Sequence, residues 1–241
     1  MLGWFGKQLA RPTQSLSGWL TTRFFKFHNH LLEENSVKLC DLQPDETVLE
    51  IGHGPGLGLQ HAIQKLTGPQ GRLLGVDYSE YMHLMASELM KEQISAGKVK
   101  LFLSDVAKMP IEDNSVDKVF HCNCYYFWPD LKRGAAEIHR VMKPGGLMVT
   151  TLRLDRVILF ASKKIMTAEN WRPKDYMEAL ESARFINVRM ENRKPSELQL
   201  QCQLTVNHTD ITLNTEPFTL RGHPQTHKPH PLYADRTRPD M

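Results

Sequence analysis

The stretch VLEIGHGPGLG at residues 48–58 is the part of the sequence best suited to bind a ligand through its backbone. An apolar run ends in Gly52, and glycine then recurs at Gly54, Gly56 and Gly58. Glycine at a strand end lets a ligand lie against the main chain and permits dihedral angles that a Cβ atom disfavours. A helix that starts there also offers unpaired N–H groups and a partial positive charge, which suit a carboxylate.

These glycines do not match the common phosphate-binding signatures. The dinucleotide spacing G-x-G-x-x-G, started at Gly52, needs glycine at position 57, where the chain has Leu57. Started at Gly54, the same spacing is broken by Pro55 and Gly56. A P-loop is excluded because no G-K-[ST] follows. An NAD-dependent reductase on a similar sheet is therefore the weaker alternative.

Acidic residues end the next two expected strands. Asp77 ends RLLGVD (72–77), where a carboxylate can hold the two hydroxyls of a ribose. Asp105 ends VKLFLSD (99–105), where it can accept from an adenine amino group or, alternatively, serve as an N-cap or turn acid. A bare glycine turn followed by these two acids describes a nucleoside that carries a carboxylate and no phosphate. S-adenosylmethionine (SAM) is such a ligand.

The stretches VLEIGHGPG, GVDYSEYMHLMA, SDVAKMPIEDNSVDKVF and RVMKPGGLMV together carry a family resemblance. Residues 44 to 152 resemble the class I SAM-dependent methyltransferases, in the branch of methyltransferase type 11 and the ubiquinone/menaquinone C-methyltransferases. The resemblance implies an α/β fold: a doubly wound, mostly parallel, seven-stranded Rossmann-like sheet with helices on both faces and less certain outer strands. It also implies methyl transfer from SAM to an unidentified small-molecule or lipid-like acceptor. The alternative is a non-catalytic SAM-binding module of the same fold.

The resemblance assigns cofactor contacts to the matching positions. They cover the methionine end, the ribose, the adenine and the residues beside the methyl group: Glu50, Gly52, Gly54, Gly56, Asp77, Tyr78, Met82, Asp105, Val106, Cys122 and Asn123. Met82 is equally well explained as a core residue. Gly58 is expected to serve only the close packing of helix on strand.

The stretch HCNCYYFWPD (121–130) is the expected active-site loop, and its candidate catalytic residues are His121, Tyr125 and Tyr126. Aromatic rings there could hold a flat substrate or a sulfonium by cation–π attraction, although Phe127 is expected to pack under the sheet edge. His121 could act as a base, or be a strand-end residue bonded to backbone. No metal is expected. His121, Cys122 and Cys124 leave a zinc site one ligand short, and on a strand the two cysteines point to one face and the histidine to the other.

Alternating apolar runs and helical patterns predict parallel βαβ units. The expected strands are 48–51, 72–77, 99–105, 116–122 and 147–152, with strand-like stretches at 185–190 and 198–206. The expected helices are 57–66, 79–97, 130–146 and 174–185. The ligand of such a sheet binds at the carboxyl ends of its strands.

We expect three regions: an N-terminal segment at 1–35, a methyltransferase domain at 36–206 and a disordered, proline-punctuated tail at 207–241. The first 32 residues are basic, aromatic and free of Asp and Glu. They could form a cap helix or lid, a mitochondrial transit peptide, or a helix that makes peripheral contact with a membrane.

The composition sets the remaining expectations. A net charge of +3 over 241 residues gives no support for a nucleic-acid partner. Four scattered cysteines do not form a disulfide framework, so a cytoplasmic location is expected, with mitochondrial as the alternative. No apolar run reaches the length of a transmembrane helix.

Overall fold

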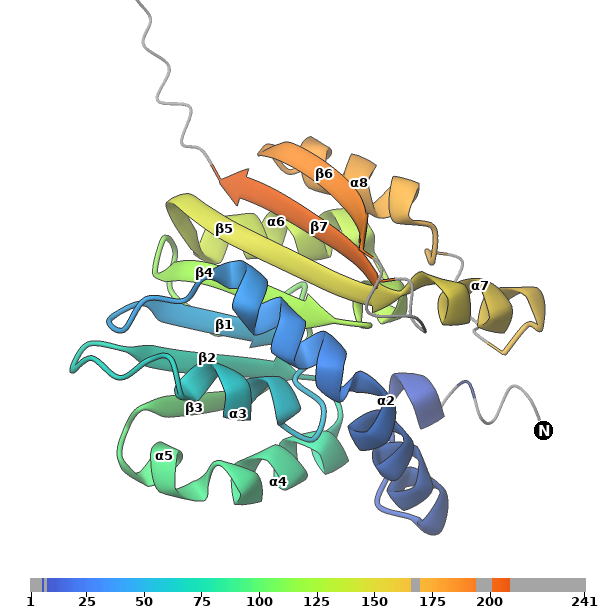
Figure 1. The fold of residues 1–241 in the computed structure, drawn as a ribbon, viewed down its shortest axis with the longest axis horizontal. Coiled ribbons are helices and arrows are strands. Elements are labelled where there is room, and N and C mark those ends of the chain that lie inside the picture. Colours follow the sequence, from blue (N-terminus) through green and yellow to red (C-terminus); the bar gives the residue numbers. More distant parts are fainter. Residues whose placement is uncertain (1–5, 7, 166–169, 194–200, 209–241) are drawn as a thin grey trace, which may run out of the picture. The chain divides into compact units, whose positions relative to one another are not determined.

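The computed structural model describes residues 6, 8–165, 170–193 and 201–208, and for residues 24–26, 192–193 and 201–208 it describes the backbone alone (Figure 1). The strands are β1 Thr47–Ile51, β2 Arg72–Asp77, β3 Val99–Leu103, β4 Val116–Cys122, β5 Met142–Arg153, β6 Phe185–Arg193 and β7 Gln201–His208. The helices are α2 Leu16–Cys40, α3 Leu57–Ile63, α4 Glu80–Leu89, α5 Lys91–Ser95, α6 Leu131–Val141, α7 Leu154–Ser162 and α8 Pro173–Ser182, with a 3₁₀ turn, η1, at Tyr125–Phe127.

The sheet has the strand order β3-β2-β1-β4-β5-β7-β6. The strands from β3 to β5 pair in parallel, and β7 runs antiparallel to both of its neighbours. The predicted α/β class with a mostly parallel sheet is confirmed. Strands β2 and β3 follow β1 on one side of it, and β4 and β5 lie on its other side. This reversal of the strand order at β1 leaves a crevice at the carboxyl ends of the strands.

Helices cover both faces of this sheet and enclose two hydrophobic clusters (Figure 1). On one face, Val48 and Phe120 pack with residues of α2, α3 and α4. On the other face, Leu49 and Val119 pack with residues of α6 and α8. Successive strand residues point to opposite faces, so neighbours such as Val48 and Leu49 belong to different clusters.

Helix α2 is part of this core. Leu32 and Cys40 are fully buried, and the Cys40 thiol donates to the carbonyl oxygen of Val119 at 3.7 Å. Thr151 of β5 donates through Oγ1 to the carbonyl oxygen of Leu32 at 3.3 Å and also bonds the hydroxyl of Ser36. The helix continues through residue 35, where the sequence suggested a boundary between segment and domain.

Several element ends differ from their predicted positions. The helix expected at 130–146 ends at Val141, because Met142 takes extended dihedrals and pairs with Val116, so the Lys143–Pro144 step lies within β5. The helix expected at 79–97 is interrupted at Met90. Helix α7 was not predicted from the sequence.

The bounds of the last strand also differ. The strand-like stretch expected at 198–206 corresponds to β7, Gln201–His208, which pairs with β5 and β6. The tail expected at 207–241 otherwise lies outside the described residues. Among the helices described, none combines the length and apolar character needed to cross a bilayer.

The docking of α2 gives a first prediction. Leu32→Ala should lower the free energy of unfolding by about 2–5 kcal/mol, because it leaves a cavity in the interior. Leu31→Ala, on the exposed face one position earlier, should change it by less than about 0.5 kcal/mol. Urea denaturation of both variants checks this. Equal effects would mean that α2 does not fold as part of the domain core.

Candidate functional site

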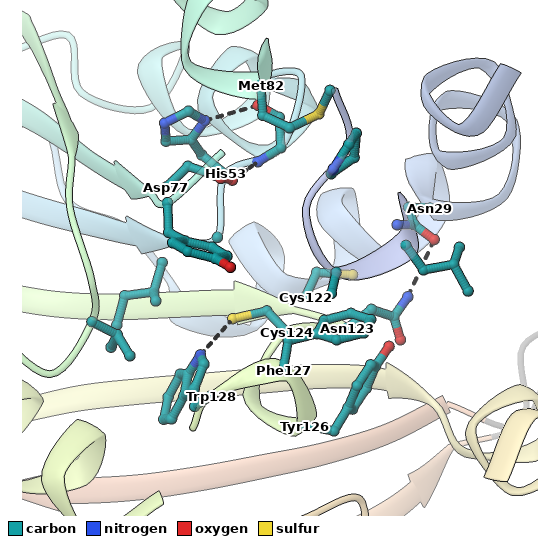
Figure 2. A pocket seen from close by; sticks show the side chains of 18 of the residues that line it. Asn29, His53, Asp77, Met82, Cys122, Asn123, Cys124, Tyr126, Phe127 and Trp128 are labelled. Carbon is teal, nitrogen blue, oxygen red and sulfur yellow. Dashed lines mark hydrogen bonds between the residues drawn. The ribbon is translucent and has the colours of Figure 1, made fainter. Parts of the chain in front are cut away.

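A cavity lies at the carboxyl ends of β1, β2, β3 and β4 (Figure 2). Its walls come from the glycine turn after β1, the ends of β2 and β3, the loop after β4, and parts of α2 and α7. Ten of the predicted site residues line it: Gly52, Gly54, Asp77, Tyr78, Met82, Asp105, Val106, Cys122, Asn123 and Tyr126.

The turn after β1 is held by the acid at the end of β2. Asp77 accepts the N–H of Gly54 on Oδ2 at 2.9 Å and the N–H of Ser79 on Oδ1 at 2.8 Å. Gly52 and Gly54 both have positive φ, +67° and +52°, where glycine is favoured. A Cβ atom at Gly54 would meet nothing within 4 Å, so this part of the turn presents bare backbone to the cavity.

The next part of the cavity is formed by Met82 and the residues that follow β3. Met82 is buried and yet lines the cavity, so it is both a core residue and a wall. Asp105 accepts the N–H of Ala107 at 2.9 Å, which makes it a turn acid that also faces the cavity. Val106 is buried beside it.

Residues before α2 close this end. Leu9, Ala10 and Pro12 line the cavity, and Ser79 donates through Oγ to the carbonyl oxygen of Pro12 at 2.7 Å. The Arg11 guanidinium lies 4.7 Å from the centre of the exposed Tyr78 ring. The N-terminal segment is thereby attached to the end of β2.

The loop after β4 forms the opposite end of the cavity. Asn123 has a φ of +49° and accepts the N–H of Arg153 at 3.0 Å, while its amide nitrogen donates to Asn29 of α2 at 3.2 Å (Figure 2). The Trp128 indole N–H donates to Cys124 Sγ at 3.2 Å. These bonds tie the loop to α2, to β5 and to itself.

Aromatic rings and two arginines complete this end. Tyr126 and Phe127 line the cavity, and Phe127 also packs against the larger hydrophobic cluster, as expected. Arg153 pairs with Asp155, and the Arg156 guanidinium lies 3.4 Å from His28 Nδ1 of α2. Burial and the two arginines lower the pKa of His28.

His121 does not reach the cavity. It is fully buried on the other face of β4, where its Nε2 lies 2.8 Å from both the Tyr176 hydroxyl and Thr150 Oγ1. Burial lowers its pKa to about 3. The structure therefore shows a neutral core histidine bonded to side chains and not a base beside a ligand.

Three further predicted residues lie behind the cavity wall. Tyr125 stacks on Tyr176 with ring centres 4.3 Å apart, and its hydroxyl donates to the carbonyl oxygen of Trp171. Glu50 is buried against Gly58, where a Cβ would lie 2.3 Å from its Oε1, which fits the close packing expected of Gly58. Gly56 caps α3 with a φ of +93°.

Sequence reasoning missed several lining residues. His53 lies inside the glycine motif, is buried, and bonds the Gly54 carbonyl through Nδ1, while its Nε2 has no partner. Glu33 and Asn29 come from α2, four residues apart and thus on one helix face. One signal could have identified Glu33: it is the first acid after 32 residues that have none.

The thiols near the cavity are not reactive. Cys122 and Cys124 are buried free cysteines, and burial raises the pKa of both. A buried protonated thiol is a poor nucleophile and a poor metal ligand. In the part of the chain that the structure describes, no three His, Cys, Asp or Glu side chains gather as a metal site would require.

Comparison with known proteins shows which family this domain resembles. Residues 49–150 match the family model described as "Methyltransferase domain". Phosphoethanolamine N-methyltransferase 2 of Caenorhabditis elegans is 27% identical over 162 residues, which are 64% of this chain and 36% of the relative. Demethylmenaquinone methyltransferase of Geobacillus kaustophilus is 29% identical over 140 residues, 58% of each chain.

A solved structure shows the same fold. The Haemonchus contortus phosphoethanolamine N-methyltransferase 2 in complex with phosphomonomethylethanolamine and S-adenosylhomocysteine superposes with a TM-score of 0.65 at 17% identity, over 87% of this chain and 60% of that one. The chain thus has a class I SAM-dependent methyltransferase fold, and residues 49–150 match the methyltransferase domain family. It spans between about a third and two thirds of the length of the first curated relatives it matches.

The buried His121 gives a pH prediction. Its pKa lies below that of an unfolded histidine, so its contribution to stability is complete above pH 6.5 and is lost as the pH falls toward 3. Between pH 7 and pH 5 this loss should be about 2 kcal/mol. Urea unfolding at both pH values should show a smaller difference for His121→Gln than for the wild type. An equal difference would mean that the pKa of His121 is the same in the folded and the unfolded protein.

Proposed function

We propose that this protein is an enzyme that transfers a methyl group from SAM to a small-molecule or lipid-like acceptor. The observation that carries the proposal is the cavity itself, in which a bare glycine turn, Asp77 and Asp105 follow three adjacent strands. The residues fit the cofactor. Gly54 leaves open the space that a Cβ would fill, and each Asp77 oxygen can accept a ribose hydroxyl in addition to its backbone N–H.

Bound SAM supplies an activated methyl group on a sulfonium. The chain's own residues hold the two reactants in position and exclude water. Cys122, Cys124 and Trp128 are buried beside the strand ends and exclude water from this part of the cavity. Burial raises the pKa of Tyr126, so its phenol stays neutral and can hydrogen-bond an acceptor without removing its proton. Methyl transfer that relies on alignment of the two reactants does not require an acid–base pair of side chains, and no such pair is evident in the sequence.

The acceptor end favours a partly apolar molecule. Tyr126, Phe127, Val157 and Phe160 provide the apolar wall. Phosphomonomethylethanolamine in the related Haemonchus structure supports a small acceptor, and the sterol 24-C-methyltransferase of Pneumocystis carinii, 32% identical over 106 residues, supports a lipid-like one.

A thermal melt tests the cofactor. S-adenosylhomocysteine at about 100 times its Kd should add about 2.7 kcal/mol of stability, which raises the Tm by several degrees. SAM should act likewise, NAD should not, and Asp77→Ala should remove the shift because the turn and the ribose lose their shared acceptor. Glu88→Ala, an exposed acid on α4, is the control. A folded wild type that responds to neither adenosyl ligand would contradict the proposal.

We further propose that residues 1–32 contact an anionic membrane surface. Leu16, Trp19, Leu20, Phe27 and Leu31 of α2 expose their side chains, Phe27 to 83%. At 100° per residue these five positions share one face of the helix. The acid-free segment complements anionic lipid. Arg156 of α7 next to His28 places this helix beside the acceptor end, so a lipid-like acceptor could enter from the membrane.

Vesicle co-sedimentation tests this contact. The wild type should bind vesicles that contain phosphatidylserine, more weakly at high salt, and the double variant Trp19→Ala/Phe27→Ala should bind at least tenfold more weakly because two large apolar side chains no longer insert. Ile186→Ala, on an exposed β6 residue, should bind like the wild type. Equal binding by both variants, or none by the wild type, would contradict the proposed contact.

A further inference from the structure

Two carboxyl groups are buried near each other beside the cavity. Glu33 of α2 is 7% exposed and Glu50 of β1 is 1% exposed. In each, Oε2 has no hydrogen-bond partner. The Cys122 side chain lowers the pKa of Glu33 and the backbone of Leu59 lowers that of Glu50, in each case less than burial raises it. Burial of a carboxyl oxygen without a hydrogen-bond partner costs free energy, and a ligand that donates a hydrogen bond to this oxygen offsets the cost.

The described part of the chain brings no cation to this pair. Burial raises the pKa of Glu33 to about 8. Burial raises the pKa of Glu50 as well, and the negative charges of Glu33 and Asp77 raise it further. In neither case does a lysine or arginine oppose the shift. At pH 7 the Glu33 carboxyl is therefore protonated in most molecules, and a cationic ligand would favour its ionised form.

The position of Glu33 indicates which part of the ligand it meets. Asp105 and Val106 follow β3 at one end of the cavity, and Asp77 follows β2. Glu33 lines the cavity together with Gly52, which follows β1, and Cys122, which ends β4. Strands β1 and β4 come next after β2 in the order of the sheet. A nucleoside that has its base near β3 and its ribose near β2 directs its 5′ substituent toward β1 and β4. In SAM that substituent is the methionine part, which carries an α-ammonium group.

We propose that the carboxylate of Glu33 binds the α-ammonium group of SAM and so selects ligands that carry the amino-acid part. This inference rests on the proposed function, because it assigns a residue of α2 to the same cofactor. Burial favours the neutral form of Glu50, one layer deeper, so Glu33 is the member of the pair that faces the ligand. The free Oε2 of Glu33 accepts the charge-assisted hydrogen bond that the folded chain leaves unfilled.

Two ligands that differ in the amino-acid part test the role of Glu33. S-adenosylhomocysteine and 5′-methylthioadenosine share the adenosine and the thioether, and only the first carries the ammonium. Glu33→Gln should raise the Kd of S-adenosylhomocysteine at least tenfold and that of methylthioadenosine less than twofold, by isothermal titration calorimetry. Glu34→Gln is the matched control, because Glu34 is next in sequence and pairs with Lys38 instead.

The outcomes separate this inference from the proposed function. Equal weakening of both ligands, or unchanged binding of S-adenosylhomocysteine, overturns the role of Glu33 while the cofactor assignment stands. A wild type that binds neither ligand overturns the cofactor assignment and this role with it. Because glutamine resembles a protonated glutamate, the variant should unfold at a Tm equal to or above that of the wild type, which keeps the comparison valid.

Proton release provides a second readout. At pH 7, binding of the ammonium should release a proton from Glu33, so the measured enthalpy should depend on the ionisation enthalpy of the buffer. The other titratable groups that face Glu33 are Glu50, Cys122 and Cys124. Loss of the buffer dependence in Glu33→Gln assigns the proton to Glu33. Persistence of the full dependence contradicts the proposed contact.

Discussion

The bonds from Asp77 to Gly54 and Ser79 are the constraint on which the rest of the site depends. One carboxylate holds the glycine turn of β1 and the start of α4 at the same time. The adjacent, parallel pairing of β1 and β2 brings these two loops within reach of each other. Gly52 and Gly54 leave the turn bare because glycine has no side chain, and the bond from Gly54 to Asp77 restrains a backbone that glycine alone would leave flexible.

Strand β4 shows how one sequence stretch serves two faces. His121 points into the core, where the Tyr176 hydroxyl and Thr150 satisfy it, whereas its neighbour Cys122 faces the cavity. The alternation was predictable from strand geometry and was used to argue against a metal site. Which of the two faces carried the ligand was not predictable from the loop alone, because both are apolar. The candidate base was consequently placed on the wrong side.

The sequence therefore predicted the parallel core and the strand-end residues that line one half of the cavity. The glycine turn, Asp77 and Asp105 occupy strand ends, where position along the chain determines position in space. The other half depends on α2 and α7, which reach the cavity through long-range packing. No local pattern of residues tells that Asn29 will meet Asn123 or that Arg156 will lie near His28. Propensity and periodicity describe an element and do not say where it docks.

The N-terminal segment contacts both ends of the cavity. Pro12 is bonded to Ser79 near Asp77, and His28 and Asn29 meet α7 and the loop after β4. Residues 9–12 belong to neither hydrophobic cluster, although three of them line the cavity. Local opening of a segment held by few bonds requires far less free energy than global unfolding. The cavity can therefore open at this end while both hydrophobic clusters stay intact.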